Sequence, residues 1–366
     1  MLIVDAHLDL AWNALQWNRD LRQSVYTIRT QEAGLPEKAR TLGTVALPEL
    51  QAGRVALAFA TMLARSTGQT VAGLDYGSAA QAYGAAQGQL AYYRALAQQQ
   101  HVRIVEDAVA LDAHLAAWQA WETTASVGNS AGAPPLGLVL SMEGADPILE
   151  PADLGNWHAA GLRLLGPAHY GPGRYAGGTG TELGLTTLGQ ALVDEMAQLG
   201  MALDVTHLSD PAFWQALDLF DGPVLASHNN CRALVPHQRQ FSDDQLKALI
   251  ARNSVIGVAF DAWMLAPGWL RGVSRPESMA GGPVTIATVV DHIDYLCQLA
   301  GNSRHAAIGT DLDGGFGREQ SPHDLDTIAD LQRIPALLAD RGYREGDIAA
   351  IMHGNWCDFL RRAWAD

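Results

Sequence analysis

The sequence predicts an α/β fold, a (β/α)8 TIM barrel, and three observations support this prediction. Short apolar runs alternate with helical patterns along all 366 residues, as in chains that build a parallel sheet from βα units. Eight of these runs have the length and composition of strands. Most of the eight are almost continuously apolar, which is typical of strands that are buried on both faces.

The expected elements follow one another regularly along the chain. Runs rich in Val, Ile, Leu and Ala predict strands at residues 2–5, 55–62, 136–142, 162–166, 202–205, 224–227, 255–260 and 306–310. Helical patterns are found at residues 78–100, 187–199, 210–220, 242–251, 285–300 and 324–340. Several of these helices begin with Ser, Thr or Asp, whose side chains cap free N–H groups of the first turn.

A doubly wound open sheet is the alternative fold. It has less support, because no GxGxxG motif follows the first strand. Three segments are expected to lack regular structure: a surface loop at 122–135, a glycine-rich loop at 170–181 and an irregular insertion at 261–283. No linker stands out between the elements, so we expect one domain over residues 1–366.

Composition excludes several classes of protein. The net charge is −15, from 39 acidic and 24 basic residues, which argues against nucleic-acid or anionic-membrane partners. The three cysteines are far apart and form no CxxC pair, so we expect neither a disulfide framework nor a cysteine zinc site. The chain shows no signal-peptide pattern and no apolar run of about 18–20 residues. We therefore expect a cytoplasmic protein.

Six of the eight predicted strands end in His, Glu or Asp. The first strand leads into His7 and Asp9, which alternate along the chain and therefore share one face. The other residues of this kind are Glu143, His169, His207, His228 and Asp311. In a (β/α)8 barrel, the carboxyl ends of the strands meet on the face that carries the chemistry.

Each of these residues alone has an ordinary explanation. A single His after a strand usually lies in a loop or core with its hydrogen bonds satisfied, and a single Asp is often a helix N-cap. Six such strand ends on one rim are different, because buried carboxylates and imidazoles cost free energy unless they are paired or bind metal. The pattern therefore predicts a metal site.

The number of ligands indicates two metal ions. Three histidines, Asp9 and Glu143 exceed what one tetrahedral zinc ion needs. A carboxylate can bridge two ions through its two oxygens, and Glu143 is suited to this position. A water or hydroxide shared by the ions would be the nucleophile. Asp311 and His169 remain for proton transfer and carbonyl polarisation.

The ordered set of motifs resembles the renal (membrane) dipeptidase family, a branch of the amidohydrolase-like metal-dependent barrels. The resemblance extends over most of the chain and is carried by DAHLDL (5–10), SMEG (141–144), GPAHY (166–170), DVTHLSD (204–210), ASHNNCRAL (226–234), HQRQFSDDQL (237–246), AIGTDLDGG (307–315) and HGNW (353–356). It implies two Zn²⁺ ions per chain. The implied ligands are His7, Asp9, the bridging Glu143, His207 and His228. A homodimer is compatible with the resemblance.

The resemblance also implies roles for three residues around the metals. His169 matches the histidine that contacts the scissile carbonyl, and Asp311 matches the aspartate proposed to transfer the proton. Arg239 matches the arginine that binds the carboxylate of the substrate, a role that suits the planar guanidinium. The sequence departs from the family around His169, after His228 and in the 261–283 insertion. These departures concern the walls of the substrate site.

Several other polar or aromatic residues have a structural interpretation. We expect Arg232 to form an ion pair, and Asp5 and Asp313 to support the fold. Tyr170, Arg174 and Tyr175 are expected either to touch substrate or to lie in an exposed loop. The tryptophans at 263 and 269 are expected to take part in packing, and a lid or dimer contact is the alternative.

The sequence as a whole predicts a dinuclear zinc dipeptidase that acts on small dipeptides. Two alternatives remain open at this point. One is a metal-dependent hydrolase of another small amide or a lactone, which the unusual loops favour. The other is a barrel without catalytic activity that binds a small ligand, against which the complete ligand set and Asp311 argue.

Overall fold

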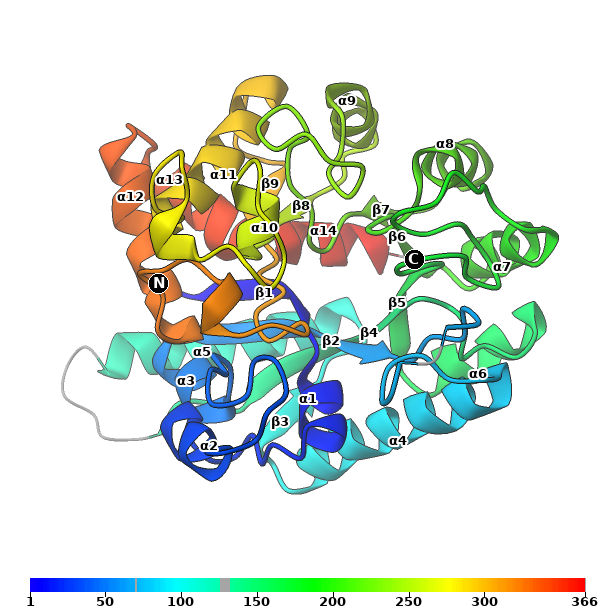
Figure 1. Ribbon diagram of the computed structural model, residues 1–366, viewed down its shortest axis with the longest axis horizontal. Coiled ribbons are helices and arrows are strands. Elements are labelled where there is room, and N and C mark those ends of the chain that lie inside the picture. The colour runs from blue at the N-terminus through cyan, green and yellow to red at the C-terminus, as the bar shows by residue number, and fades with distance from the viewer. Residues whose placement is uncertain (70, 126–131, 366) are drawn as a thin grey trace.

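Parallel strands surround the centre of the computed structural model, which describes residues 1–69, 71–125 and 132–365 (Figure 1). In this part of the chain, eight strands form the ring: β1 (Ile3–Leu8), β2 (Val55–Leu63), β4 (Leu136–Glu143), β5 (Leu162–Gly166), β6 (Ala202–Asp204), β7 (Val224–Leu225), β8 (Ile256–Val258) and β9 (Ala306–Ile308). Each overlaps a strand expected from the sequence. The predicted (β/α)8 barrel is confirmed.

Two sheets make up the ring. One has the order β1-β2-β4-β5-β6-β7, and the other is the pair β8-β9. A parallel bridge between Ala226 and Ile256 joins them on one side. On the other side, the Asp5 carboxylate accepts hydrogen bonds from the N–H and the hydroxyl of Thr310, at 2.8 and 2.6 Å. Asp5 therefore links the first strand to the last, which agrees with its expected structural role.

Strand β3 (Val102–Ile104) was not expected from the sequence. It pairs with the first residues of β4, Leu136 to Leu138, whereas β5 pairs with β4 from Leu140 onward. It has only three residues, and Arg103 between its two apolar residues is exposed. Such a short run carries too little periodicity to be recognised.

Helices surround the ring, except for the last one, which lies behind its centre (Figure 1). In the described ranges they are α1 (Leu10–Gln16), α2 (Val25–Gln31), α3 (Leu47–Ala52), α4 (Ala79–Gln98), α5 (Ala108–Ala125), α6 (Leu154–Ala159), α7 (Thr187–Gln198), α8 (Asp210–Leu219), α9 (Asp243–Ala251), α10 (Ala262–Leu265), α11 (Ile286–Ala300), α12 (Ile334–Asp340), α13 (Glu345–Ala349) and α14 (Asn355–Ala363). The expected N-caps are present at Ser78 and Ser242, whose side chains accept from N–H groups of the first turn.

Two sequence expectations about these segments were wrong in part. The loop expected at 122–135 begins too early, because its first four residues complete α5; residues 126–131 lie outside the described residues. The helix expected at 324–340 instead contains a 3-10 helix, Ile328–Arg333, followed by α12. Pro335 in the first turn of α12 has no N–H to continue a regular helix from the preceding residues.

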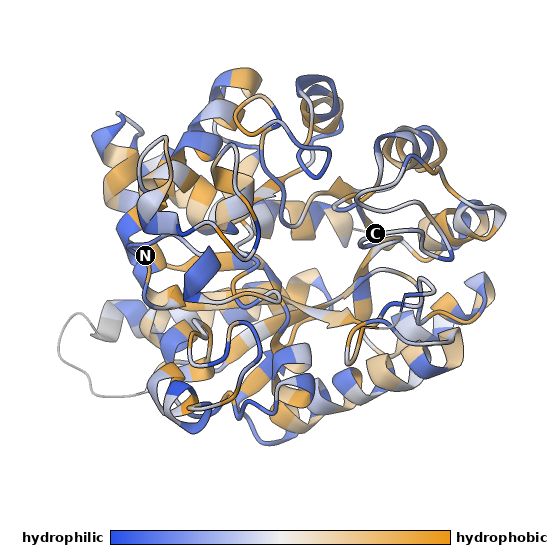
Figure 2. Cartoon of the chain, in the orientation of Figure 1, coloured by the Kyte–Doolittle hydropathy of each residue, from blue (hydrophilic) through white to orange (hydrophobic). Residues whose placement is uncertain are grey.

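Hydrophobic residues are concentrated in the strands and along one side of many helices, as the ribbon colours of Figure 2 show. Alternate residues of the strands, such as Leu57 and Phe59, point into the barrel, where they form one cluster with Trp356 of α14. The Trp356 indole donates to the carbonyl of Ile308, at 2.9 Å, and its ring edge packs on Phe59. The HGNW motif thus closes the amino-terminal end of the barrel and leaves the opposite end for the site.

Candidate metal centre

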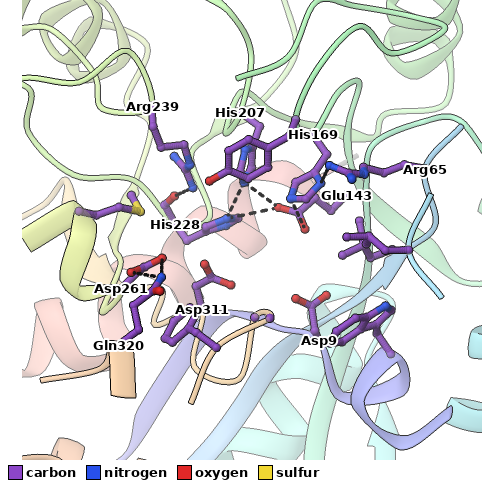
Figure 3. A pocket seen from close by; sticks show the side chains of 18 of the residues that line it. Asp9, Arg65, Glu143, His169, His207, His228, Arg239, Asp261, Asp311 and Gln320 are labelled. Carbon is purple, nitrogen blue, oxygen red and sulfur yellow. Dashed lines mark hydrogen bonds and ion pairs between the residues drawn. The ribbon is translucent and has the colours of Figure 1, made fainter. Parts of the chain in front are cut away.

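The predicted site residues meet at the carboxyl end of the barrel, and all of them except His7 are labelled in Figure 3. Glu143 is the last residue of β4. Four other residues each lie three positions beyond the end of a strand: His169 after β5, His207 after β6, His228 after β7 and Asp311 after β9. The repeated spacing places their side chains at the same height above the ring.

Asp9 occupies the N-cap position of α1, but its side chain caps no N–H group of the helix. Its Oδ2 instead lies 3.7 Å from Nε2 of His7. The same nitrogen of His7 lies 3.6 Å from Oε2 of Glu143 and 3.9 Å from Oδ1 of Asp311. The capping explanation for Asp9 is therefore wrong, and this carboxylate is turned toward the centre.

Glu143 directs its two oxygens to two different groups of residues. Oε2 faces His7, whereas Oε1 lies 3.1 Å from Nε2 of His207 and 3.3 Å from Nε2 of His228. The ligand atoms of His7, Asp9 and Glu143 lie within 4.8 Å of one another, and so do those of Glu143, His207 and His228. The structure thus brings together the two ligand groups expected from the sequence, with Glu143 shared between them.

The spacing of these atoms fits metal ions. A tetrahedral ion with ligands at 2.0–2.2 Å holds neighbouring ligand atoms about 3.3–3.6 Å apart. Within the described residues, His7 Nε2, Asp9 Oδ1 and Glu143 Oε1 are buried and have no hydrogen-bond partner. Buried polar atoms are rarely left in this way unless something binds them. The set of imidazoles and carboxylates suits zinc and other first-row divalent ions.

The second nitrogen of each of these imidazoles is held by a hydroxyl group. Nδ1 of His7 lies 3.3 Å from Thr61 Oγ1, and Nδ1 of His207 lies 3.0 Å from Thr179 Oγ1. Nδ1 of His228 lies 2.9 Å from the hydroxyl of the preceding residue, Ser227. These contacts orient the rings so that Nε2 points to the centre, as outer partners of metal-bound histidines do.

The electrostatics of the centre also favour bound cations. Burial raises the pKa of Glu143 to about 7, although the neighbouring His7 opposes the shift. Burial also raises the pKa of Asp311, and it lowers the pKa of His207 and of His228. Glu143 and Asp311 therefore resist ionisation together without added positive charge, and metal ions would supply that charge.

The backbone is strained at two of these positions. His207 has φ 68° and Asp311 has φ 58°, in the left-handed region that few residues other than glycine adopt. A Cβ on Gly314 would lie 1.8 Å from Oδ1 of Asp311, so only glycine leaves room for this carboxylate. The DLDGG segment therefore holds Asp311 in one particular place.

Beside the centre lies a cavity of about 270 Å³, just below the usual range for ligand pockets. Arg239, only 3 % exposed, lines it. Its Nη2 donates to the carbonyl of His228, at 2.8 Å, while Nε and Nη1 have no hydrogen-bond partner among the described residues. His169 also lines the cavity, and its pKa is lowered by burial and by the nearby guanidinium of Arg65.

The residues with an expected structural role have that role. Arg232 forms a bidentate ion pair with Asp210, at 2.7 and 2.8 Å. Asp313 is buried and accepts hydrogen bonds from the backbone N–H groups of residues 44 and 45. The expectation that Arg174 and Tyr175 touch substrate or lie in an exposed loop was wrong, because neither lines the cavity and Tyr175 is buried. Both donate to the carbonyl of Ile148 and secure the glycine-rich loop.

The structure adds residues that the sequence did not single out. The cavity is also lined by Trp12, Lys38, Arg65, Asp261, Arg271 and Gln320. Tyr170 lines it too, and its hydroxyl accepts from Arg271, at 2.9 Å. Arg271 in turn lies over the ring of Trp263, 4.1 Å from its centroid. The insertion at 261–283 therefore forms one wall of the cavity.

Comparisons with known proteins identify one family. The profile of the family "Membrane dipeptidase (Peptidase family M19)" matches residues 1–364. An uncharacterised protein of Klebsiella pneumoniae is 32 % identical over 238 residues, 63 % of this chain and 83 % of that protein. Dipeptidase aclJ of Aspergillus oryzae is 29 % identical over 203 residues, which cover 54 % of this chain and 44 % of aclJ.

Two solved structures have the same fold over the whole chain. The crystal structure of dipeptidase AC, a metallopeptidase of family M19, superposes with a TM-score of 0.75 at 23 % identity, covering 100 % of this chain and 99 % of the other. A metallopeptidase from Rhodobacter sphaeroides gives 0.74 at 22 % identity, with the same coverage. Among the described residues, no helix has the length and apolar character needed to cross a membrane.

Proposed function

This chain belongs to the membrane dipeptidase family, peptidase family M19, and on that premise we propose that it is a dinuclear zinc dipeptidase. The observation that carries the proposal is the position of Glu143. Its Oε2 faces His7 and its Oε1 faces His207 and His228, so one carboxylate serves two ligand groups.

We assign the metal ligands from these two groups. His7, Asp9 and Glu143 would hold one ion, and Glu143, His207 and His228 would hold the other. When bound, a pair of zinc ions supplies an acidified water as the nucleophile and stabilises negative charge on the reacting oxygens.

Arg239 would fix the substrate by its free carboxylate. Its Nη2 keeps one N–H beyond the one used by His228, and together with the unpaired Nε or Nη1 group it can bind a planar anion through two parallel hydrogen bonds. The small cavity favours a short substrate. The Rhodobacter sphaeroides metallopeptidase was crystallised with a phosphinate mimic of the dipeptide L-Ala-D-Ala, which supports a dipeptide as the class of substrate.

His169 and Asp311 would assist the reaction. His169 lines the cavity with Nε2 3.8 Å from Oε2 of Glu143, where it would donate a hydrogen bond to the peptide carbonyl. Asp311 lies with Oδ1 3.9 Å from Nε2 of His7 and also lines the cavity. It would receive a proton and pass it to the leaving amine.

A panel of dipeptides tests this function. The purified protein is stripped of metal, divided, and assayed with L-L and L-D dipeptides before and after zinc is restored. Hydrolysis that depends on restored metal is the expected result. If no dipeptide is cleaved while the zinc content reaches about two per chain, the peptidase function is wrong and the metal assignment stands.

A further inference from the structure

Arg65 lies beside His169 at the edge of the cavity (Figure 3). It follows β2 by two residues, and its backbone is held on both sides. Its N–H donates to the carbonyl of Leu74 and its carbonyl accepts from the N–H of Tyr76, both at 2.8 Å. The side chain is only 8 % exposed. The guanidinium therefore has little freedom to move.

Two contacts define the position of the guanidinium. Nη2 lies 3.4 Å from Oδ2 of Asp75, whose side chain is fully buried. Asp75 is itself anchored, because it accepts hydrogen bonds from the N–H and the hydroxyl of Thr67. Nη1 lies 3.4 Å from Nδ1 of His169. Asp75 thus forms an ion pair with Arg65 and holds it against the histidine ring.

In the contact between Arg65 and His169, only Arg65 can be the hydrogen-bond donor. A guanidinium carries only N–H groups and no acceptor, so Nδ1 of the ring has to be the acceptor. The proton of the neutral ring is then on Nε2, which faces the cavity near Glu143. We propose that Arg65 is a positioning residue that holds His169 in its Nε2–H tautomer, ready to donate to the substrate carbonyl.

This inference rests on the proposed function, in which His169 donates to the substrate. A neutral histidine without such a partner can take either tautomer. In the Nδ1–H form, the lone pair of Nε2 would face the carbonyl oxygen, and the hydrogen bond would become a repulsion. The adjacent positive charge of Arg65 also makes the Nε2–H group a stronger donor. Both effects grow as negative charge develops on the oxygen, so Arg65 acts on kcat more than on KM.

The tautomer can be measured directly in the zinc-loaded enzyme. The protein is labelled with ¹⁵N-histidine, and long-range ¹H–¹⁵N spectra show which ring nitrogen carries the proton. The signal of His169 is the one missing from His169→Gln. We expect a protonated Nε2 and an unprotonated Nδ1. A proton on Nδ1 in the unmodified protein would overturn the proposal, whether or not any Arg65 variant folds and whether or not dipeptides are substrates.

Substitutions of Arg65 distinguish a positioning role from a role in substrate binding. Arg65→Met removes the donor and keeps most of the apolar stem, whereas Arg65→Lys keeps a donor and the charge. We expect Arg65→Met to populate the Nδ1–H tautomer and to lower kcat about 10- to 100-fold, with KM nearly unchanged. Arg65→Lys should keep part of the Nε2–H tautomer and part of the kcat. A higher KM with unchanged kcat would make Arg65 a substrate-binding group and would overturn the proposal.

A matched control is Arg163→Met. Arg163 forms an ion pair with Glu106, at 3.1 Å, and its side chain is 15 % exposed, but it does not line the cavity. Its replacement removes a comparably buried guanidinium and should leave the His169 tautomer and kcat unchanged. An equal loss of kcat in Arg163→Met and Arg65→Met, with the tautomer intact in both, would show that the effect is only structural.

Discussion

Arg239→Met should abolish the preference for substrates with a free carboxylate. In the structure, Arg239 is buried beside the centre, and no acidic side chain of the described residues is paired with it. One of its N–H groups, on Nη2, serves the backbone of His228, and the groups on Nε and Nη1 have no partner. A buried guanidinium without an anion is costly for the fold, which points to an anionic ligand.

The size of the effect follows from the two hydrogen bonds that the guanidinium can offer to one carboxylate. A hydrogen bond to a charged partner contributes about 1.5–3 kcal/mol. Two such bonds give about 3–6 kcal/mol, or roughly a 10²- to 10⁴-fold loss in kcat/KM. The free energy of unfolding should hardly change or should rise, because methionine removes an uncompensated buried charge. Activity and stability are thus expected to move independently.

The assay compares each dipeptide with its C-terminal amide. The unmodified protein should prefer the free acid, and Arg239→Met should cleave both at similar low rates, with KM for the free acid strongly raised. Arg252→Met is the control, since Arg252 is half-buried and donates to three backbone carbonyls outside the cavity. If Arg239→Met keeps the preference for the free acid, the carboxylate is bound elsewhere and the reasoning is refuted.

Three further predictions concern the centre and its support. Glu143→Gln should reduce the zinc content from about two per chain towards zero by elemental analysis, and retention of both ions would refute a bridging role. Asp311→Asn should lower kcat about 10²- to 10⁴-fold with zinc content unchanged, and a kcat near that of the unmodified protein would exclude proton transfer by Asp311. Asp313→Ala should lower the free energy of unfolding in urea by about 3–5 kcal/mol, because two buried N–H groups lose their acceptor and Arg19 loses one of its two carboxylate partners; a change below about 1 kcal/mol would contradict this.

The residues at the strand ends could be predicted because the apolar runs that identify them are close by in the sequence. His7, Glu143 and His207 each follow an apolar run within a few residues, and in a parallel barrel the end of such a run fixes where the side chain lies. The positions of the ligands along the chain therefore predicted that they lie together at the carboxyl end of the barrel. The ion pair of Arg232 was predicted on weaker grounds, and its partner, Asp210, was identified only in the structure.

The partners of these ligands could not be predicted. Thr61 supports His7 from 54 positions away, and Arg65 contacts His169 across 104 positions. Threonines and arginines of this kind occur throughout the chain, and nothing in their neighbours distinguishes the ones that reach the centre. The same applies to Asp261 and Gln320, which form a hydrogen-bonded pair in the cavity wall.

The sequence by itself determined the barrel, the residues at its strand ends and their grouping around Glu143, because each depends on the position of a residue relative to its own strand. Only the tertiary structure decided how those residues are oriented. The hydroxyl groups behind the imidazoles, the guanidinium against His169 and the free N–H groups of Arg239 come from contacts between distant segments. Such contacts depend on the packing of loops above the ring, for which the sequence has no periodic signal.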